Sequence, residues 1–269
     1  IDVYSLEGKK VEEIKLPEVF QTEYRPDLIQ RAVVALQSQR RQPYGSFKEA
    51  GMQTTADYFG RRRDAYRQTI NRGISRLPRE KPGGGGLGKV RRVPHSVGGR
   101  RAHPPKPEKN LQKKINKKEY QYALKSSLAA LTNKELAQKR GHKLSKKIKE
   151  IPLVIEDKIE EIKKTKDVVN ILNKLGLEEE LSRAKVKKVR AGKGKMRGRK
   201  YKKKKSLLIV VNEDKGIIKG GKNIPGVDVV RVKDLSVELL APGAHPGRLS
   251  LWTKSALENV NKIFENGSN

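Results

Sequence analysis

The feature that most limits how this chain can fold is residues 40–110, where apolar side chains follow neither a helical nor a strand period. Glycine and proline fill 18 of these 71 positions, including the run Gly83–Gly86, and regular elements rarely tolerate so many. Such a stretch cannot supply a hydrophobic core. We therefore expect one globular domain from residues 1–40 and 110–269, interrupted by an extended internal arm at 41–109.

The charge of the chain is large and unevenly distributed. Lys and Arg number 62 against 30 Asp and Glu, a net charge of +32. Residues 40–110 carry +13, residues 113–149 carry +10 and residues 183–205 carry +14, so the remainder nets −5. This pattern indicates a mildly acidic body with basic appendages, which require an anionic partner. No run of about 18 apolar residues exists that could span a membrane, and nucleic acid is the expected partner.

The composition of the arm favours RNA. It prefers Arg to Lys and keeps aromatic residues among the arginines, whereas disordered linkers, the alternative interpretation, are usually poor in aromatics. Arg contacts phosphate with two parallel hydrogen bonds, and aromatic rings stack on unpaired bases. Candidate RNA-binding residues at its start are Arg40, Arg41 and Tyr44. We expect the arm to be disordered alone and ordered by RNA.

The remaining sequence predicts an α/β fold. Nearly continuous apolar strands that alternate with helices favour a mostly parallel sheet covered by helices on both faces, in a single Rossmann-like domain. Asp27, after Pro26, is predicted to cap the first helix. The expected strands are 2–6, 151–155, 206–212, 227–232 and 248–252, and the expected helices are 27–40, 110–131, 166–175, 235–240 and 255–264.

Two basic segments of the folded part are further candidates for RNA contact. The helix at 110–131 has an apolar stripe and several lysines on its other faces, for which a merely solvated face is the alternative. The Lys-rich run at 183–205 has no acidic residue, and we interpret it as a segment that neutralises phosphates. For Lys202–Lys205 within this run, a nuclear import signal is the alternative. The candidates are Lys113, Lys114, Lys117, Lys118, Arg197, Arg199 and Lys200.

Residues that could support catalysis or bind a cofactor are few. Cysteine is absent, and the four histidines are not placed at metal-ligand spacing. The run from Gly83 to Lys89 has the glycines of a phosphate-binding loop, but Val90 stands where the magnesium-binding hydroxyl belongs, and no strand precedes the run. We expect no enzyme activity, no metal and no cofactor. An RNA contact is expected for His95, and a structural turn for His245.

Several blocks resemble the archaeal and eukaryotic branch of the universal large-subunit ribosomal protein four family. They are Val3–Gly8, Leu16–Phe20, Arg25–Ile29, Gln42–Gly45, Ala50–Ala56, Val97–Pro105, Lys114–Glu119, Ser127–Ala130 and Pro242–Thr253. The resemblance covers essentially the whole chain. The lack of the long C-terminal extension of eukaryotic members points to an archaeon.

The resemblance implies a structural constituent of the large ribosomal subunit, in the cytoplasm, whose arm runs through ribosomal RNA and helps line the nascent-peptide tunnel. The expected partners are that RNA and neighbouring ribosomal proteins, including another arm-bearing protein at the tunnel constriction, with no membrane and no homo-oligomer. Matching positions put Met52, Thr54, Arg100, Arg101 and His103 in RNA-contacting stretches. The tunnel-proximal candidates are Arg61, Arg62, Arg63, Arg67, Arg72, Arg76, Arg91, Arg92 and His95.

One departure from the family pattern and two alternative functions stay open at this point. At Gly60–Asp64 the family more often has a glycine-rich turn, so the residue that reaches the tunnel wall is not assigned.

One alternative function is that of an RNA-modifying or nucleotide-using enzyme on a Rossmann-like core. Such an enzyme needs a glycine-rich turn after the first strand, where Gly8 is the single glycine. The other is a DNA-compacting protein, against which the aromatic residues of the arm argue.

Overall fold

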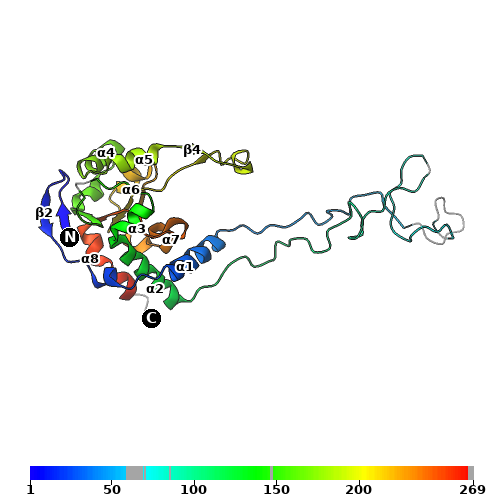
Figure 1. The fold of residues 1–269 in the computed structure, drawn as a ribbon, viewed down its shortest axis with the longest axis horizontal. Coiled ribbons are helices and arrows are strands. Elements are labelled where there is room, and N and C mark those ends of the chain that lie inside the picture. Colours follow the sequence, from blue (N-terminus) through cyan, green and yellow to red (C-terminus); the bar gives the residue numbers. More distant parts are fainter. Residues whose placement is uncertain (59–68, 70, 85, 146–147, 266–269) are drawn as a thin grey trace. The chain divides into compact units, whose positions relative to one another are not determined.

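A computed structural model describes residues 1–58, 69, 71–84, 86–145 and 148–265. The chain divides into two compact units, shown in Figure 1. The first unit consists of Ile1–Gln39 and Lys113–Asn269, and the second is Arg40–Gln112.

The centre of the first unit is a six-stranded, mostly parallel sheet in the order β2-β1-β3-β8-β6-β7. Only the pairing of β1 with β2 is antiparallel, and the pairs β1·β3, β3·β8, β8·β6 and β6·β7 are all parallel. The strands are β1 (Asp2–Tyr4), β2 (Lys10–Glu13), β3 (Leu153–Ile155), β6 (Leu208–Val211), β7 (Asp228–Arg231) and β8 (Ser250–Thr253). The predicted sheet is thus confirmed, with an edge strand, β2, that its fully exposed, charged sequence did not reveal.

Successive residues of the inner strands pack into two separate hydrophobic cores, because side chains alternate between the faces of a sheet. Leu208 and Val210 face one core, and Ile209 and Val211 face the other. Both faces are buried, which is why β6 is an uninterrupted apolar run. Trp252 of β8 is fully buried in the first core, where Phe20 meets its ring edge-on at 5.7 Å.

Helices cover both faces. The first core is closed by α1 (Pro26–Gln39), α2 (Lys117–Ala129), α7 (Val237–Leu240), α8 (Lys254–Asn259) and α9 (Lys262–Glu265). The second is closed by α3 (Lys134–Lys139), α4 (Thr165–Lys174), α5 (Glu178–Lys185) and α6 (Ile217–Lys222). Short 3₁₀ helices are η1 (Glu18–Gln21), η2 (Ala130–Thr132), η3 (Asp157–Glu161), η4 (Lys193–Lys195), η5 (Val232–Asp234) and η6 (Pro242–Ala244).

Between α5 and β6 in the chain lies a two-stranded antiparallel hairpin, which projects from the rest of the first unit (Figure 1). It is formed by β4 (Lys188–Val189) and β5 (Tyr201–Lys202), with η4 near its tip. This hairpin occupies most of the Lys-rich run at 183–205, whose order the sequence left open.

The structure corrects several predicted boundaries. The helix expected at 110–131 begins at Lys117, because Asn116 adopts the extended conformation of an N-cap, a position that Asn favours. Helix α1 begins at Pro26, so Asp27 lies in its first turn and does not cap it; both carboxylate oxygens accept hydrogen bonds from Arg25. The closing helix is divided into α8 and α9.

The second unit contains no helix and no strand longer than an isolated bridge among its described residues. Bridges join Arg79 to Asp57 and to Val90. Nearer its ends, the Ser46 amide donates to the Pro105 carbonyl, and a Cβ on Gly51 (φ +78°) would lie 2.6 Å from the Arg100 Cα. Glycine is therefore required at position 51, where the two segments of the chain come into contact.

The described residues of the second unit do not form a hydrophobic core of their own. Ala56 is the one buried apolar residue among those of this unit that the structure describes. No helix in the described part of the chain has the length and apolar character needed to cross a membrane.

Candidate nucleic-acid interface

The two edges of the parallel sheet differ in charge: the amino edge is basic, whereas the carboxyl edge carries acidic residues among its lysines. At the amino ends of β6, β7 and β8 lie the lysines of the hairpin base and Arg248. The opposite edge, where these strands and β3 end, carries acidic residues: Glu156, Asp157, Glu160, Glu161, Glu213, Asp214 and Asp234. Nucleotides in Rossmann folds bind at the carboxyl edge, where phosphate would here meet acid.

Two of these carboxylates form hydrogen bonds to other residues at the carboxyl edge. The Glu160 carboxylate is buried and accepts hydrogen bonds from the Asn212 amide at 2.8 Å and the Thr253 hydroxyl at 3.1 Å. Asp157 accepts from the backbone and the hydroxyl of Ser255. These contacts hold the ends of β6 and β8 together.

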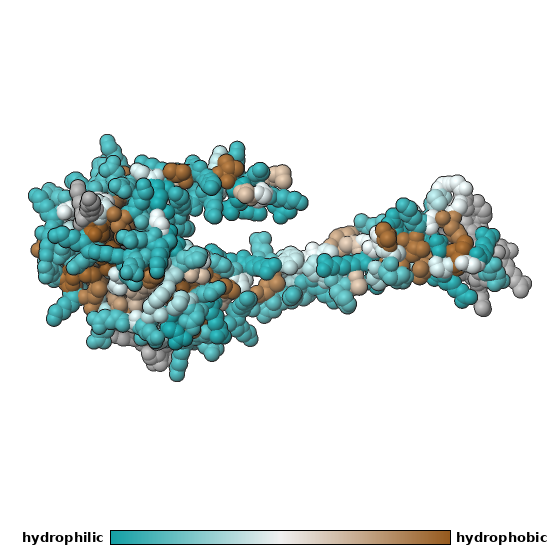
Figure 2. All heavy atoms as spheres, viewed as in Figure 1, coloured by the Kyte–Doolittle hydropathy of each residue, from teal (hydrophilic) through white to brown (hydrophobic). Residues whose placement is uncertain are grey.

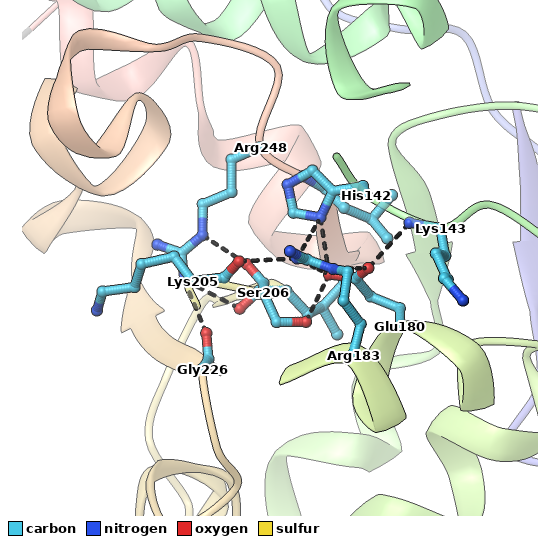
Figure 3. A network of polar contacts seen from close by, with 10 residues as sticks. His142, Lys143, Glu180, Arg183, Lys205, Ser206, Gly226 and Arg248 are labelled. Atoms are coloured by element: carbon cyan, nitrogen blue, oxygen red, sulfur yellow. Dashed lines mark hydrogen bonds and ion pairs between the residues drawn. The ribbon is translucent and has the colours of Figure 1, made fainter. Parts of the chain in front are cut away.

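A buried polar network fixes the amino edge (Figure 3). The Glu180 carboxylate, 1% exposed, lies between His142 and Arg183. It accepts hydrogen bonds from His142 Nδ1 at 2.7 Å, from the Ser206 hydroxyl at 2.8 Å, from the Lys143 amide at 3.0 Å and from two nitrogens of Arg183. Every lone pair of this buried carboxylate thus has a donor.

The pKa values of Glu180 and His142 both lie below those of the free groups. Burial by itself would raise the pKa of Glu180, but the hydrogen bonds from His142, Arg183 and the Lys143 amide outweigh it and lower the pKa to about 2. Burial lowers the pKa of His142, against the opposing effect of Glu180. A neutral imidazole fits the geometry, because its Nε2 accepts from the Leu249 amide while Nδ1–H donates to Glu180.

Arg248 is the second buried member of this edge, with 1% exposure. Its guanidinium donates to the carbonyls of Ser206 and Leu239 at 2.8 Å each, to that of Leu207 at 3.2 Å, and to the Asp228 carboxylate. Burial would raise the pKa of Asp228, but Arg248 and Lys205 lower it below its usual value. The charge of Arg248 is therefore balanced, and the group joins α7 to the starts of β6 and β7.

This network also fixes the base of the hairpin. Arg183, in the helix that leads into β4, donates to the Lys205 carbonyl in the segment that follows β5, at 2.9 Å. Lys205 in turn forms an ion pair with Asp228 at 2.8 Å. The hairpin is thus held at both of its ends by groups that are anchored in the sheet.

The three hairpin candidates, Arg197, Arg199 and Lys200, are all exposed near its tip. The backbone amides of Arg197 and Arg199 both donate to the Gly194 carbonyl, which leaves the side chains outside the turn. Figure 2 shows hydrophilic side chains along the hairpin with apolar ones between them; these include the exposed Val186, Val189 and Met196.

The candidates beside α2 are exposed as well. Lys113 and Lys114 precede the helix, and Lys117 and Lys118 form its first turn. The Lys113 amide donates to the Ser38 hydroxyl at the end of α1, at 2.8 Å. Within the described part of the chain, none of these four lysines forms an ion pair with a carboxylate, so their charges face solvent.

The structure brings three second-unit candidates together. Tyr44, Arg101 and His103 line one cavity of about 610 Å³. The Arg41 guanidinium lies 5.4 Å from the Tyr44 ring centre, in a cation–π contact. Arg40 and Arg100 are exposed, as is Met52, whereas Thr54 is half-buried and its hydroxyl accepts from the Ala56 amide.

The tunnel-proximal candidates differ in solvent exposure and in their contacts within the unit. Arg72, Arg76 and His95 are exposed, and Arg92 is half-buried. Arg91 is committed to contacts inside the unit, with Glu80 and the Val97 carbonyl each at 2.9 Å. Arg61, Arg62, Arg63 and Arg67 lie outside the described residues.

The sequence did not predict the hydrogen-bond partners of Glu180, His142 and Arg248. It did not predict the contacts of Arg140 either. His142 and Glu180 lie 38 positions apart, and Arg140 donates to the carbonyls of His245 and Pro242, more than 100 positions away. Spacing carries no signal over such separations. The one available hint was the arginine in the Pro242–Thr253 block, which stands beside an apolar strand.

Comparison with known proteins shows the family of this chain. The family model described as "Ribosomal protein L4/L1 family" matches residues 14–263. The large ribosomal subunit protein uL4 of Archaeoglobus fulgidus is 51% identical over 257 residues, 95% of this chain and 96% of that protein. Those of Methanosphaera stadtmanae and Methanocaldococcus jannaschii are each 47% identical, over 98% of this chain and 97% and 98% of theirs. All three organisms are archaea, as the resemblance predicted. The chain belongs to the ribosomal protein L4/L1 family.

Proposed function

We propose that this protein is a structural constituent of the large ribosomal subunit in the cytoplasm, where it binds ribosomal RNA and stabilises its fold. The observation that carries this is the contrast between the two units. The second unit exposes many cations and aromatic rings but buries only Ala56 among its described apolar residues. A polypeptide without a core cannot offset its conformational entropy alone, and RNA supplies the missing contacts.

The RNA-binding residues of this proposal are the exposed cations described above. They comprise Arg40, Arg41, Arg100, Arg101 and His103 with Tyr44, Met52 and Thr54 in the second unit, and Lys113, Lys114, Lys117, Lys118, Arg197, Arg199 and Lys200 in the first. Lysine and arginine side chains bind phosphate, and Tyr44 beside Arg41 offers a face on which a base can stack.

We further propose that residues 41–109 act as an extended arm whose far part helps line the nascent-peptide tunnel, close to another arm-bearing ribosomal protein. The bridges of Arg79 with Asp57 and Val90 support this, because they tie the middle of the segment to itself and leave Arg72, Arg76 and His95 exposed. Arg91 and Arg92 would mainly shape this part of the arm. The protein functions as a single copy among other ribosomal proteins.

The first unit serves as the body that carries these segments, and we assign it a Rossmann-like arrangement that has lost the nucleotide site. Two features support this. The strands β3, β8, β6 and β7 are parallel, and the carboxyl edge carries acid where a dinucleotide would need a cation or free amides. The protein is not an enzyme, in keeping with the non-catalytic family to which it belongs.

Deletion of part of the second unit tests the proposal. Ser46 and Pro105 are hydrogen-bonded, so residues 47–104 can be replaced by two glycines without stretching the chain. The shortened protein should keep the unfolding temperature of the full chain but fail to enter large subunits reconstituted from RNA and proteins. Incorporation at the level of the full chain would contradict the proposal.

A variant that loses three exposed cations of the first unit serves as the control. Lys158, Lys164 and Lys166 are exposed on the side of the acidic edge, and their replacement by glutamine should leave incorporation unchanged. Cofactor binding by the shortened protein, measured with nicotinamide and adenine nucleotides, would instead favour the enzyme alternative.

A further inference from the structure

A cavity of about 810 Å³ in the first unit lies between the hairpin base and the loop that follows α7. Its walls include Tyr24, Lys139, Arg140, Arg183 and Lys202–Lys204. None of its described lining residues is acidic. The volume falls in the range of sites that hold a ligand of nucleotide size.

Arg140 is a half-buried cation of this cavity that has no counter-ion among the described residues. Arg183 is paired with Glu180 and Arg248 with Asp228, whereas Arg140 donates only to the carbonyls of Pro242, at 3.0 Å, and His245 among the described residues. Burial and the nearby Arg248 and Arg183 lower its pKa to about 10. A half-buried cation without a counter-ion favours an anion in the adjoining space.

The cavity is already shaped for a ligand. The two hydrogen bonds from Arg140 tie the loop at 242–246 to the end of α3. Gly247, at φ +84°, brings the same loop so close that a Cβ would lie 2.7 Å from the Leu136 carbonyl carbon. On the other side, Arg183 holds the hairpin base through the Lys205 carbonyl. A ligand would therefore need to order little of the wall.

The chemistry of the walls combines phosphate binding with stacking. Lys139 and Arg140 are cationic, and the Tyr24 side chain is 39% exposed, so its ring is accessible to a planar group. Lys202–Lys204 continue the positive charge from the cavity onto the hairpin. A polymer of phosphates fits this continuous path better than a free nucleotide, which would use the cavity alone.

We infer that this cavity holds one unpaired nucleotide of large-subunit RNA, with its phosphate against Arg140 and Lys139 and its base against Tyr24. The inference rests on the proposed function, and adds to it a defined site in the folded body of the protein. The RNA on either side of this nucleotide then follows the lysines of the hairpin base.

Photo-cross-linking in the reconstituted large subunit tests the site. Tyr24 is replaced by p-benzoylphenylalanine in the full chain, and the cross-linked nucleotides are mapped by primer extension. A cross-link to a single unpaired nucleotide is expected. The same replacement at Val11, which is 52% exposed on the edge strand β2, gives the background. A cross-link to another ribosomal protein, to double-stranded RNA, or to nothing above background would overturn the inference.

Three variants connect the cross-link to the cavity. Arg140→Gln, and separately Lys139→Gln, should each lower the yield of the Tyr24 cross-link, by about tenfold for Arg140, whose charge has no other partner. Lys222→Gln, at an exposed lysine of the neighbouring cavity, is matched in charge and should change the yield less than twofold. Arg140 also holds the loop at 242–246, so the unfolding temperature of its variant is measured first. If that temperature is lowered, the exposed Lys139 provides the test instead. Equal yields for Lys139→Gln and Lys222→Gln would refute the site.

The experiment separates this inference from the proposed function. Entry of the wild-type chain into the subunit reports on the proposed function, and the position of the cross-link reports on the cavity. Normal entry without the single-nucleotide cross-link refutes the cavity site alone. Failure of the wild-type chain to enter refutes both.

Discussion

Single residues in this protein fall into two groups that use charge in opposite ways. Glu180, Arg248 and Asp228 are buried or half-buried, and their charges are matched within the fold. Most of the cations proposed to bind RNA are instead exposed to solvent. The buried groups therefore affect folding, and the exposed ones affect affinity for RNA.

Replacement of Glu180 by glutamine should destabilise the first unit and change its response to pH. The pKa of Glu180 is about 2 in the folded chain against 4.5 for the free group, so its contribution is complete above pH 4.5 and is lost as the pH falls towards 2. We expect a loss on the order of 2 kcal/mol at pH 7, measured by urea unfolding. The difference from wild type should shrink over that same interval.

Glu179→Gln, an exposed neighbour on α5, is the control and should leave the unfolding free energy nearly unchanged. His142 also makes the folded chain less stable at low pH. Its pKa is lower in the folded chain, so the unfolded chain takes up the proton first as the pH falls below 6.5. A Glu180→Gln variant with wild-type stability at pH 7 would show that the network contributes nothing.

Arg248→Lys should cost about 3 kcal/mol of unfolding free energy, because lysine cannot serve Asp228 and the surrounding carbonyls at once. Thermal unfolding followed by circular dichroism measures the change. Arg231→Lys, whose ion pair with Asp234 is exposed, should cost less than about 1 kcal/mol. Similar costs for the two variants would contradict the role given to Arg248.

At the scale of elements, the hairpin of β4 and β5 is the clearest case of local sequence placed by distant contacts. A hairpin this short is not stable by itself. Its position is set by Arg183, the Lys205 carbonyl and Asp228, which connect its two ends to α5 and β7. The hairpin can therefore present cations at a fixed place relative to the sheet.

The hairpin cations should change RNA affinity without changing stability. A triple replacement of Arg197, Arg199 and Lys200 by glutamine should keep the unfolding temperature. The slope of the logarithm of RNA affinity against the logarithm of salt concentration should fall by about 2, as expected when some three phosphate contacts are lost. Filter binding over a salt series measures it, with the triple Lys158, Lys164 and Lys166 variant as control. An unchanged slope would remove the hairpin from the interface.

At the scale of the whole molecule, the two units differ in what holds them together. The first unit has two cores, one on each face of the sheet. The second depends on turns and isolated bridges among its described residues. Burial of apolar surface is the main driving force of folding, so only the first unit has the means to fold independently.

Hydrogen exchange of the full chain should show this difference. Without RNA, amides of 71–84 and 86–112 should exchange at close to the rate of an unfolded chain, while those of Leu208–Val211 stay protected. Addition of large-subunit RNA should slow the exchange of the second unit by at least tenfold. Mass spectrometry of peptic fragments measures both states. Strong protection of 71–84 before RNA is added would contradict the proposal.

Features that depend on local sequence patterns were predictable from the chain alone. Apolar runs such as Leu208–Val211 predicted parallel strands, and the missing period over 40–110 predicted a segment without a core. Local patterns were weaker at boundaries: α2 starts seven residues later than its stripe suggested, and the charged strand β2 has no apolar signal.

Contacts between groups that are distant in the chain could not be predicted from local patterns. His142 with Glu180, Arg183 with Lys205, and Arg140 with the loop at 242–246 are each joined across 22 to 105 positions. Sequence patterns report which face of an element a residue occupies, whereas these contacts depend on how the elements pack. For the same reason, the sequence marked residues 183–205 as basic, but the packing of α5, β6 and β7 decided that they form a hairpin with an anchored base.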